Sequence, residues 1–265
     1  MGLLFAEGRG FGYFSRTSEP ERINHLNQFY GLKKWGWVIY RCTYGDDSAW
    51  QRFIDRFNDH LAQVLREYYH MDPEFFASYE CSVEEDPSGL DGATKDEVRR
   101  RFRMLRDALI ATETPVDLDD FKRHALLREN PRFNYCIHVD KNALESVLQQ
   151  PSNYVEGTIP GYVNLVRADE NWAMPDFDLF NWEKYMADKK KQSSSGGAGD
   201  DGDDTEGDED DDFDEGEPEI EGSRLFDVGW MRIKVETLIP EMYDTMIKGF
   251  MWRKFYCRPP EVADR

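Results

Sequence analysis

The sequence predicts a single α+β domain in which helices pack on one face of a mostly antiparallel sheet, as in ferredoxin-like folds. Three observations lead to this prediction. Aromatic residues make up 14% of the 265-residue chain, which favours a substantial core. Segments with a period of two alternate with segments of helical period along the chain. One acidic stretch, residues 200–221, interrupts the pattern before a last strand and helix complete the domain.

The first clear elements are a strand, a helix and a second strand. The β-branched and aromatic residues of 35–43 predict a strand. Ser48 and Gln51 have the spacing of a capping box and precede an apolar stripe, which predicts a helix over 48–68. The stripe consists of Trp50, Phe53, Ile54, Phe57, Leu61, Leu65 and Tyr68. Alternating residue types predict a half-buried strand over 75–83.

The middle of the chain repeats this succession. Thr94 and Glu97 form a second capping box, which predicts a helix extending to Leu109. Residues 133–140 alternate with strict period two and predict a strand with one buried and one more polar face. Asp140 is placed to cap the helix that follows. The remaining predicted elements are a helix over 141–150, strands over 161–168 and 228–237, and a last helix from Pro240.

The predicted organisation has four parts. They are a flexible N-terminal segment 1–30, an α+β core 31–186, a disordered acidic linker 187–223, and a C-terminal strand and helix in 224–265. The acidic stretch 200–221 holds 15 Asp or Glu and no Lys or Arg, so it cannot bury enough apolar surface to fold. It accounts for most of the net charge of −20, because the rest of the chain has 38 acidic against 33 basic residues. Neither part offers a basic field for nucleic acid, whereas a protein with a basic surface is an expected partner.

The termini and cysteines indicate an intracellular protein. No secretory pattern begins the chain, and no apolar run approaches the ~18 residues of a membrane span. We therefore expect a cytoplasmic, or alternatively nuclear, protein without a membrane partner. The four cysteines are scattered without the spacing of a disulfide framework or a zinc site. No frame of the acidic stretch fits a calcium loop, so neither a metal nor a cofactor is expected.

The sharpest chemical candidate is the series Cys136-x-His138-x-Asp140. Residues two apart on a strand share a face but lie about 6.5–7 Å apart. A nucleophile and its base need ~2.6–3.2 Å, so a neighbouring strand would have to supply a partner. His138 is the catalytic candidate, and the alternative is a histidine hydrogen-bonded within the sheet.

The densest basic run lies in the helix predicted after Thr94. Arg99, Arg103 and Arg106 share one face of that helix, which could attract the acidic stretch in cis or an acidic partner in trans. The alternative is that they form the solvated side of an amphipathic helix.

Three segments together resemble proteins of a known group. The succession WGWVIYRCTYGDDSAWQRF, NPRFNYCIHVDKNALESV and GYVNLV resembles a large group of uncharacterised intracellular proteins of filamentous fungi, over roughly residues 31–168. The resemblance implies no activity, so it transfers no catalytic residue. Some such proteins sit beside natural-product pathway genes, which implies at most a metabolite-linked role.

Two functions therefore stay open. The first is a non-catalytic protein that binds a macromolecule or forms homo-oligomers. It is favoured by the lack of a catalytic signature, by the aromatic residues between Trp172 and Trp182 and by the acidic stretch. The second is a cofactor-free small-molecule enzyme of the oxygenase, cyclase or isomerase type, linked to natural-product metabolism, with His138 as base. The enzyme needs an enclosed pocket lined by His138 and one further polar group.

Overall fold

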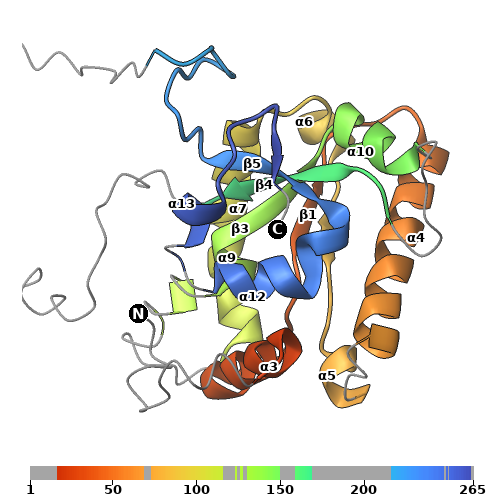
Figure 1. Cartoon of the computed structure of the whole chain (residues 1–265), viewed down its shortest axis with the longest axis vertical. Helices are drawn as coiled ribbons and strands as arrows, with labels where there is room; N and C mark the ends of the chain where they lie inside the picture. Colours follow the sequence, from red (N-terminus) through yellow and green to blue (C-terminus); the bar gives the residue numbers. More distant parts are fainter. Residues whose placement is uncertain are drawn as a thin grey trace, which may run out of the picture.

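The computed structural model describes residues 17–68, 73–115, 123, 126–127, 130–149, 159–168, 216–247, 249 and 251–263. The longer helices are α3 (Glu19–Tyr30), α4 (Asp47–Gln63), α7 (Lys95–Glu113) and α10 (Lys141–Leu148). The shorter ones are α5 (Pro73–Ala77), α6 (Pro87–Leu90), α9 (Pro131–Asn134), η1 (Val64–Tyr68), η3 (Val235–Thr237), η4 (Leu238–Met242), α12 (Tyr243–Met246) and α13 (Met251–Phe255). The strands are β1 (Val38–Arg41), β2 (Ser82–Glu84), β3 (Tyr135–Val139), β4 (Tyr162–Arg167), β5 (Trp230–Lys234) and β6 (Val262–Ala263) (Figure 1).

These strands form one mixed sheet in the order β2-β1-β3-β4-β5-β6. β1 pairs in parallel with β2 and with β3, and β5 pairs in parallel with β6. The pairings of β3 with β4 and of β4 with β5 are antiparallel. The chain is thus a mixed α/β protein, and neither the antiparallel majority nor the ferredoxin-like fold is confirmed. The reason is that α4 and α7 act as crossover helices, which return the chain to a parallel strand.

Helices cover both faces of the sheet. The larger apolar cluster joins Ile39 of β1 to Phe53 of α4, and the smaller one joins Val38 of β1 to Phe102 of α7. Because consecutive strand residues point to opposite faces, α4 and α7 lie on opposite sides of the sheet. The prediction of helices on one face is therefore wrong, and β1 and β3 are buried along their whole length.

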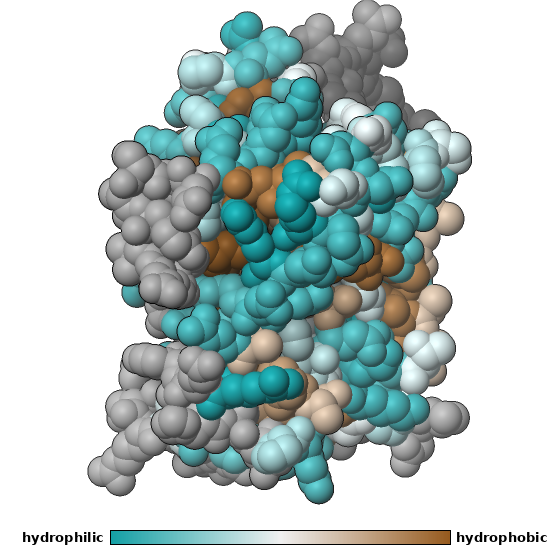
Figure 2. Space-filling view, turned by 90° about the vertical axis from the view of Figure 1, so that its right-hand side faces the viewer, coloured by the Kyte–Doolittle hydropathy of each residue, from teal (hydrophilic) through white to brown (hydrophobic). Residues whose placement is uncertain are grey.

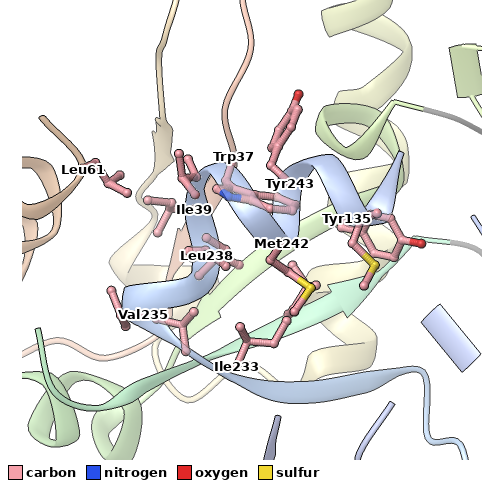
Figure 3. Close-up of a cluster of buried hydrophobic side chains, with 14 of the residues drawn as sticks. Trp37, Ile39, Leu61, Tyr135, Ile233, Val235, Leu238, Met242 and Tyr243 are labelled. Atoms are coloured by element: carbon pink, nitrogen blue, oxygen red, sulfur yellow. The ribbon is translucent and has the colours of Figure 1, made fainter. Parts of the chain in front are cut away.

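The segment after β5 closes the larger cluster. Figure 3 shows Leu238, Met242 and Tyr243 of this segment gathered against Trp37 and other side chains of the sheet. The ring of Tyr243 meets that of Trp37 edge-on, with centroids 5.0 Å apart. Such aromatic pairs add to the stabilisation from burial alone. The last part of the chain therefore belongs to the core.

Two predicted elements of the first half differ in the structure. Residues 75–83 do not form one strand, because α5 takes the beginning and β2 only the end. The ring of Phe75 stacks on Trp35 at 4.8 Å, and this contact fixes the helical turn. The N-cap of α4 is Asp46, whose carboxylate accepts from the N–H of Ala49, so the Ser48 box is not used.

Two further segments were also assigned differently. Residues 19–30, placed in the flexible N-terminal segment, form α3, which buries Ile23 and Leu26. The strand expected over 133–140 begins only at Tyr135, after the short helix α9, and both of its faces are buried. The start of α3 does carry a local signal, the capping box of Ser18 and Glu21, which the sequence prediction overlooked. The late start of β3 depends instead on tertiary packing.

Other predictions are confirmed. The Thr94 hydroxyl accepts from the N–H of Glu97 at the start of α7. Asp140 caps α10 by accepting from the N–H of Ala143 at 2.9 Å. The segment between Trp172 and Trp182 and residues 187–215 of the predicted disordered linker lie outside the described residues. Residues 216–223 of that linker are described, and Ile220 and Ser223 pair there in a turn.

The connection from β4 to β5 starts and ends at neighbouring points. The N–H of Arg167 donates to the carbonyl of Gly229 at 3.0 Å, directly before β5. The long connection therefore leaves the sheet at the end of β4 and returns to it at the neighbouring start of β5. Within the described part of the chain, no helix combines the length and apolarity that a membrane span requires.

Candidate functional site

The sheet carries a continuous row of polar side chains on the face covered by α7. Strand registers pair Glu84 with Tyr40, Tyr40 with His138, His138 with Asn164, and Asn164 with Arg232. Cross-strand partners point to the same face of a sheet. These five residues therefore form one line from β2 to β5, which we call the polar row.

His138 lies at the centre of the polar row and is only 1% exposed. Its Nε2 is 2.8 Å from the carbonyl oxygen of Ala93, which can only accept, so Nε2 carries the proton. Its Nδ1 then accepts from Nδ2 of Asn164 at 3.4 Å. Both ring nitrogens are thus engaged inside the protein.

Asp140 contacts both the asparagine that binds His138 and a lysine nearer the surface, Lys95. Its Oδ2 accepts from Nδ2 of Asn164 at 3.0 Å and lies 3.3 Å from Nζ of Lys95. The same oxygen is 3.9 Å from Nδ1 of His138, which is beyond hydrogen-bond distance. Lys95 also pairs with Glu221 at 2.8 Å. We call these five residues, His138, Asn164, Asp140, Lys95 and Glu221, the inner cluster.

Burial and charge set the protonation of this cluster. Burial lowers the pKa of His138 below its ordinary value, and the positive charge of Lys95 lowers it further. Burial works to raise the pKa of Asp140, but the N–H of Ala143 and the charge of Lys95 outweigh it, so that pKa is lowered. At neutral pH the cluster therefore holds a neutral histidine beside an ionised aspartate.

The other members of the predicted series and the basic run have structural surroundings. Cys136 is fully buried in the α7-side apolar cluster, and burial raises the pKa of its thiol. Arg99 is not on a solvated face: its guanidinium donates to the carbonyls of Arg167 and Gly229 and connects α7 to the end of β4 and the start of β5. Across the described ranges, no three His, Cys, Asp or Glu side chains are arranged to hold a metal ion.

A second feature lies at the carboxyl ends of β1 and β2. The chain leaves β1 toward α4 on one face and leaves β2 toward α7 on the other. In open α/β sheets such a divergence opens a crevice where ligands commonly bind. Six carboxylates lie at the end of β2 or in the two connections: Asp46, Asp47, Glu84, Glu85, Asp86 and Asp91. We call this group the acidic edge.

Arg41 organises the acidic edge. Its guanidinium pairs with Asp47 and lies 3.3 Å from Oε1 of Glu85. It also stacks over the ring of Tyr44, 4.4 Å from the centroid. The carboxylate of Asp47 is 88% exposed and that of Glu85 46%, whereas Arg41 is 7% exposed. The edge therefore presents net negative charge to solvent.

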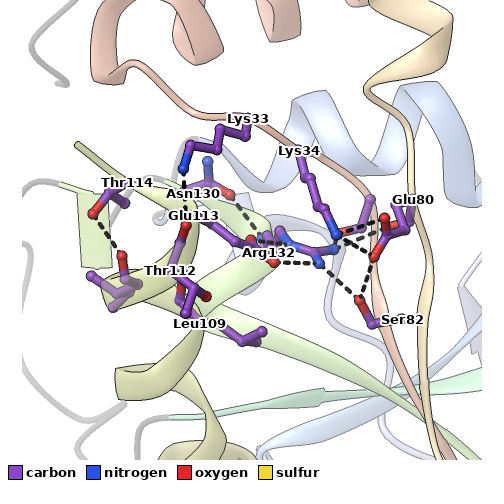
Figure 4. Close-up of polar contacts among 12 residues, drawn as sticks. Lys33, Lys34, Glu80, Ser82, Leu109, Thr112, Glu113, Thr114, Asn130 and Arg132 are labelled. Atoms are coloured by element: carbon purple, nitrogen blue, oxygen red, sulfur yellow. Dashed lines mark hydrogen bonds and ion pairs between the residues drawn. The ribbon is translucent and has the colours of Figure 1, made fainter. Parts of the chain in front are cut away.

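A third polar cluster, around Arg132, is part of the scaffold (Figure 4). Nε and Nη2 of Arg132 form two bonds to the carboxylate of Glu113, at 2.6 and 2.9 Å. Its remaining donors reach the carbonyls of Gly36 and Glu80 and the hydroxyl of Ser82. All five N–H donors of a fully buried guanidinium are therefore satisfied.

Comparisons with known proteins identify no relative. No protein-family model, no curated protein and no solved structure matches the chain. The resemblance to uncharacterised proteins of filamentous fungi stays a prediction.

The sequence pointed to His138 and Asp140 but not to their partners. Asn164 comes from the strand next to β3, as the distance argument required, yet nothing in GYVNLV marks the asparagine except its polarity within an apolar strand. Lys95 and Glu221 are 126 positions apart. Only the topology brings them together.

Proposed function

We propose that this chain is a non-catalytic intracellular binding protein whose acidic edge and acidic stretch 200–221 bind a partner protein with a basic surface. The observation that carries the proposal is the exposure of Asp47 and Glu85 at the divergence of β1 and β2. Negative charge gathered on one surface steers positively charged partners toward it. We place this function in the cytoplasm, or alternatively in the nucleus, and a homo-oligomer is compatible with it.

The surroundings of the acidic edge agree with a surface that contacts a large partner. α6 and α10 both lie at the top of the view in Figure 1, α6 on the α7 side of the sheet and α10 on the α4 side. Figure 2 shows that the upper part of the adjoining face is covered mainly by hydrophilic residues, with hydrophobic residues visible in limited patches. Polar rims around small apolar areas are typical of transient interfaces.

The state of His138 argues against its use as a general base. A base must reach a substrate proton within about 2.6–3.2 Å. The ring of His138 is 1% exposed, its Nε2 proton faces the carbonyl of Ala93, and its Nδ1 faces Asn164. Binding chemistry is therefore favoured over catalysis.

One observation keeps the cofactor-free enzyme as a second candidate. The polar row continues from His138 to Arg232, whose guanidinium stacks 4.6 Å over the half-buried ring of Tyr162. A small molecule bound over this face of the sheet would meet a cation and a phenol on the strands next to the histidine. This enzyme requires that His138→Gln abolish turnover while the melting curve stays close to that of the wild type.

The test of the binding function uses a fluorescent arginine-rich peptide and measures its anisotropy at several salt concentrations. We expect binding that weakens as salt rises, because exposed charges are screened. Replacing Asp47→Asn together with Glu85→Gln should weaken binding about tenfold. The control, Asp59→Asn with Glu145→Gln, makes the same charge change elsewhere and should leave affinity nearly unchanged. Equal losses in both double variants would contradict a localised site.

A further inference from the structure

A short hairpin lies at the end of the acidic stretch and packs beside α7. The N–H of Ile220 donates to the carbonyl of Ser223 at 2.9 Å, and the N–H of Ser223 donates back to Ile220 at 3.0 Å. The two residues between them have positive φ, 50° at Glu221 and 87° at Gly222. This is the pattern of a two-residue turn of type I′.

Glu221 is an unusual residue for its place in the turn. Positive φ at the first central position favours Asn, Asp or Gly, because a longer side chain crowds its own backbone. Among the described non-glycine residues, Glu221 alone has positive φ. Its carboxylate reaches Nζ of Lys95, 2.8 Å away. A shorter Asn or Asp side chain would extend less far toward that lysine.

Lys95 connects the hairpin to the inner cluster. It is only 9% exposed, and its ammonium lies 4.5 Å over the ring of Trp230. On its inner side Nζ is 3.3 Å from Asp140, which in turn accepts from Asn164. Glu221 is therefore the outermost link of a chain of polar contacts that ends at His138.

The hairpin contacts the rest of the protein mainly through polar groups. Ile220 packs half-buried against the α7-side apolar cluster, and Arg258 donates to the carbonyl of Pro218. The side chains of Glu219, Glu221 and Arg224 are exposed. Segments with few buried apolar contacts open at a lower free energy than the whole domain unfolds.

We infer that the hairpin 217–224 is an electrostatic strap, which closes over Lys95 through Glu221 and which a basic partner opens. A partner that binds the acidic stretch competes with Lys95 for Glu221. When Glu221 is drawn away, Lys95 and the inner cluster behind it become accessible. The opening by a partner rests on the proposed binding function, whereas the closure by Glu221 does not.

The first experiment tests the closure without any partner. The full chain is treated with an amine-acetylating reagent, and labelling of Lys95 is followed by mass spectrometry against the exposed Lys141 as reference. Glu221→Asn keeps a residue suited to the turn but removes the ion pair, so Lys95 labelling should rise at least about fivefold. Glu219→Gln, the matched neighbour, should leave it unchanged. Unchanged labelling in Glu221→Asn would overturn the strap.

The second experiment adds an N-terminally acetylated arginine-rich peptide without lysine, which has no amine to consume the reagent. Labelling of Lys95 in the wild-type chain should rise in parallel with peptide saturation. Peptide binding without a rise at Lys95 overturns the opening by a partner. Absence of peptide binding, with Lys95 exposed in Glu221→Asn, contradicts the proposed function and leaves the closure supported.

Discussion

The cluster around Arg132 and the inner cluster differ in how completely their buried donors and acceptors are satisfied. Around Arg132, five donors meet five acceptors at 2.6–3.2 Å, and every group comes from a helix, a strand or a segment next to one. In the inner cluster the separations run from 2.8 to 3.9 Å, and one member, Glu221, sits on an exposed hairpin.

This difference indicates separate roles for the two clusters. A buried charge needs full compensation, and the Arg132 cluster provides it from three separate segments, around Gly36, Glu80 and Glu113, so the arginine holds them in one arrangement. Gly36 belongs to the same arrangement, because a Cβ there would lie 2.6 Å from the carbonyl oxygen of Glu80. The inner cluster has longer contacts, and its outermost member, Glu221, is held to Lys95 by an ion pair on a surface hairpin. This cluster is suited to change.

The largest expected effect is at Arg132. Arg132→Ala leaves the carboxylate of Glu113 buried without its partner and should lower the free energy of unfolding on the order of 3–5 kcal/mol. Arg132→Lys should also be strongly destabilising, because an ammonium cannot form the two-pronged contact. Urea denaturation measures both. Arg52→Ala, on the exposed side of α4, is the control and should stay within about 0.5 kcal/mol of the wild type.

A smaller loss is expected at His138. His138→Gln can keep a donor toward the carbonyl of Ala93 but loses the contact with Asn164, so it should cost about 1–2 kcal/mol. Denaturation of this variant beside Arg132→Ala compares the two clusters directly. A cost as large as that of Arg132→Ala would mean that the inner cluster is as tightly bound as the scaffold.

The pH dependence of stability should separate the clusters as well. The folded state holds the pKa of His138 below its ordinary value of about 6.5, so the unfolded chain binds that proton more readily. The stabilisation is present above about pH 6.5 and is lost as the pH falls toward the folded-state pKa. Denaturation midpoints between pH 7.5 and 5 should fall more steeply in the wild type than in His138→Gln. Parallel pH profiles would contradict this assignment.

The smallest effect on stability is expected when the connection between β4 and β5 is shortened. Removal of 192–215, with a short flexible linker in its place, should leave the melting temperature nearly unchanged, because loop length enters closure entropy only logarithmically. Removal of 192–222 also deletes Ile220 and Glu221 and should cost about 0.5–1.5 kcal/mol more. Thermal melts of the two deletions measure the hairpin's contribution. Identical melts would show that the hairpin contributes nothing to the closed state.

Sequence patterns predicted what depends on near neighbours. The Asp140 cap and the stripe on α4 follow from spacings of three and four residues, and both are found. Strand direction was not predictable in this way, because β2 is too short to show a period and its parallel partner lies 44 positions earlier. The inner cluster depends on register and on a contact across 126 positions. Residue types alone cannot specify such contacts.

The hydrogen bond between Arg167 and Gly229 brings together the two ends of the connection between β4 and β5. The part of this connection before the hairpin 217–224 can be lengthened or shortened while the register of β4 and β5 stays the same, because loop length has only a small effect on stability. For the same reason we expect this part of the connection to tolerate an inserted domain. A fluorescent protein with adjacent termini, inserted there, would report on partner encounters without disturbing its host.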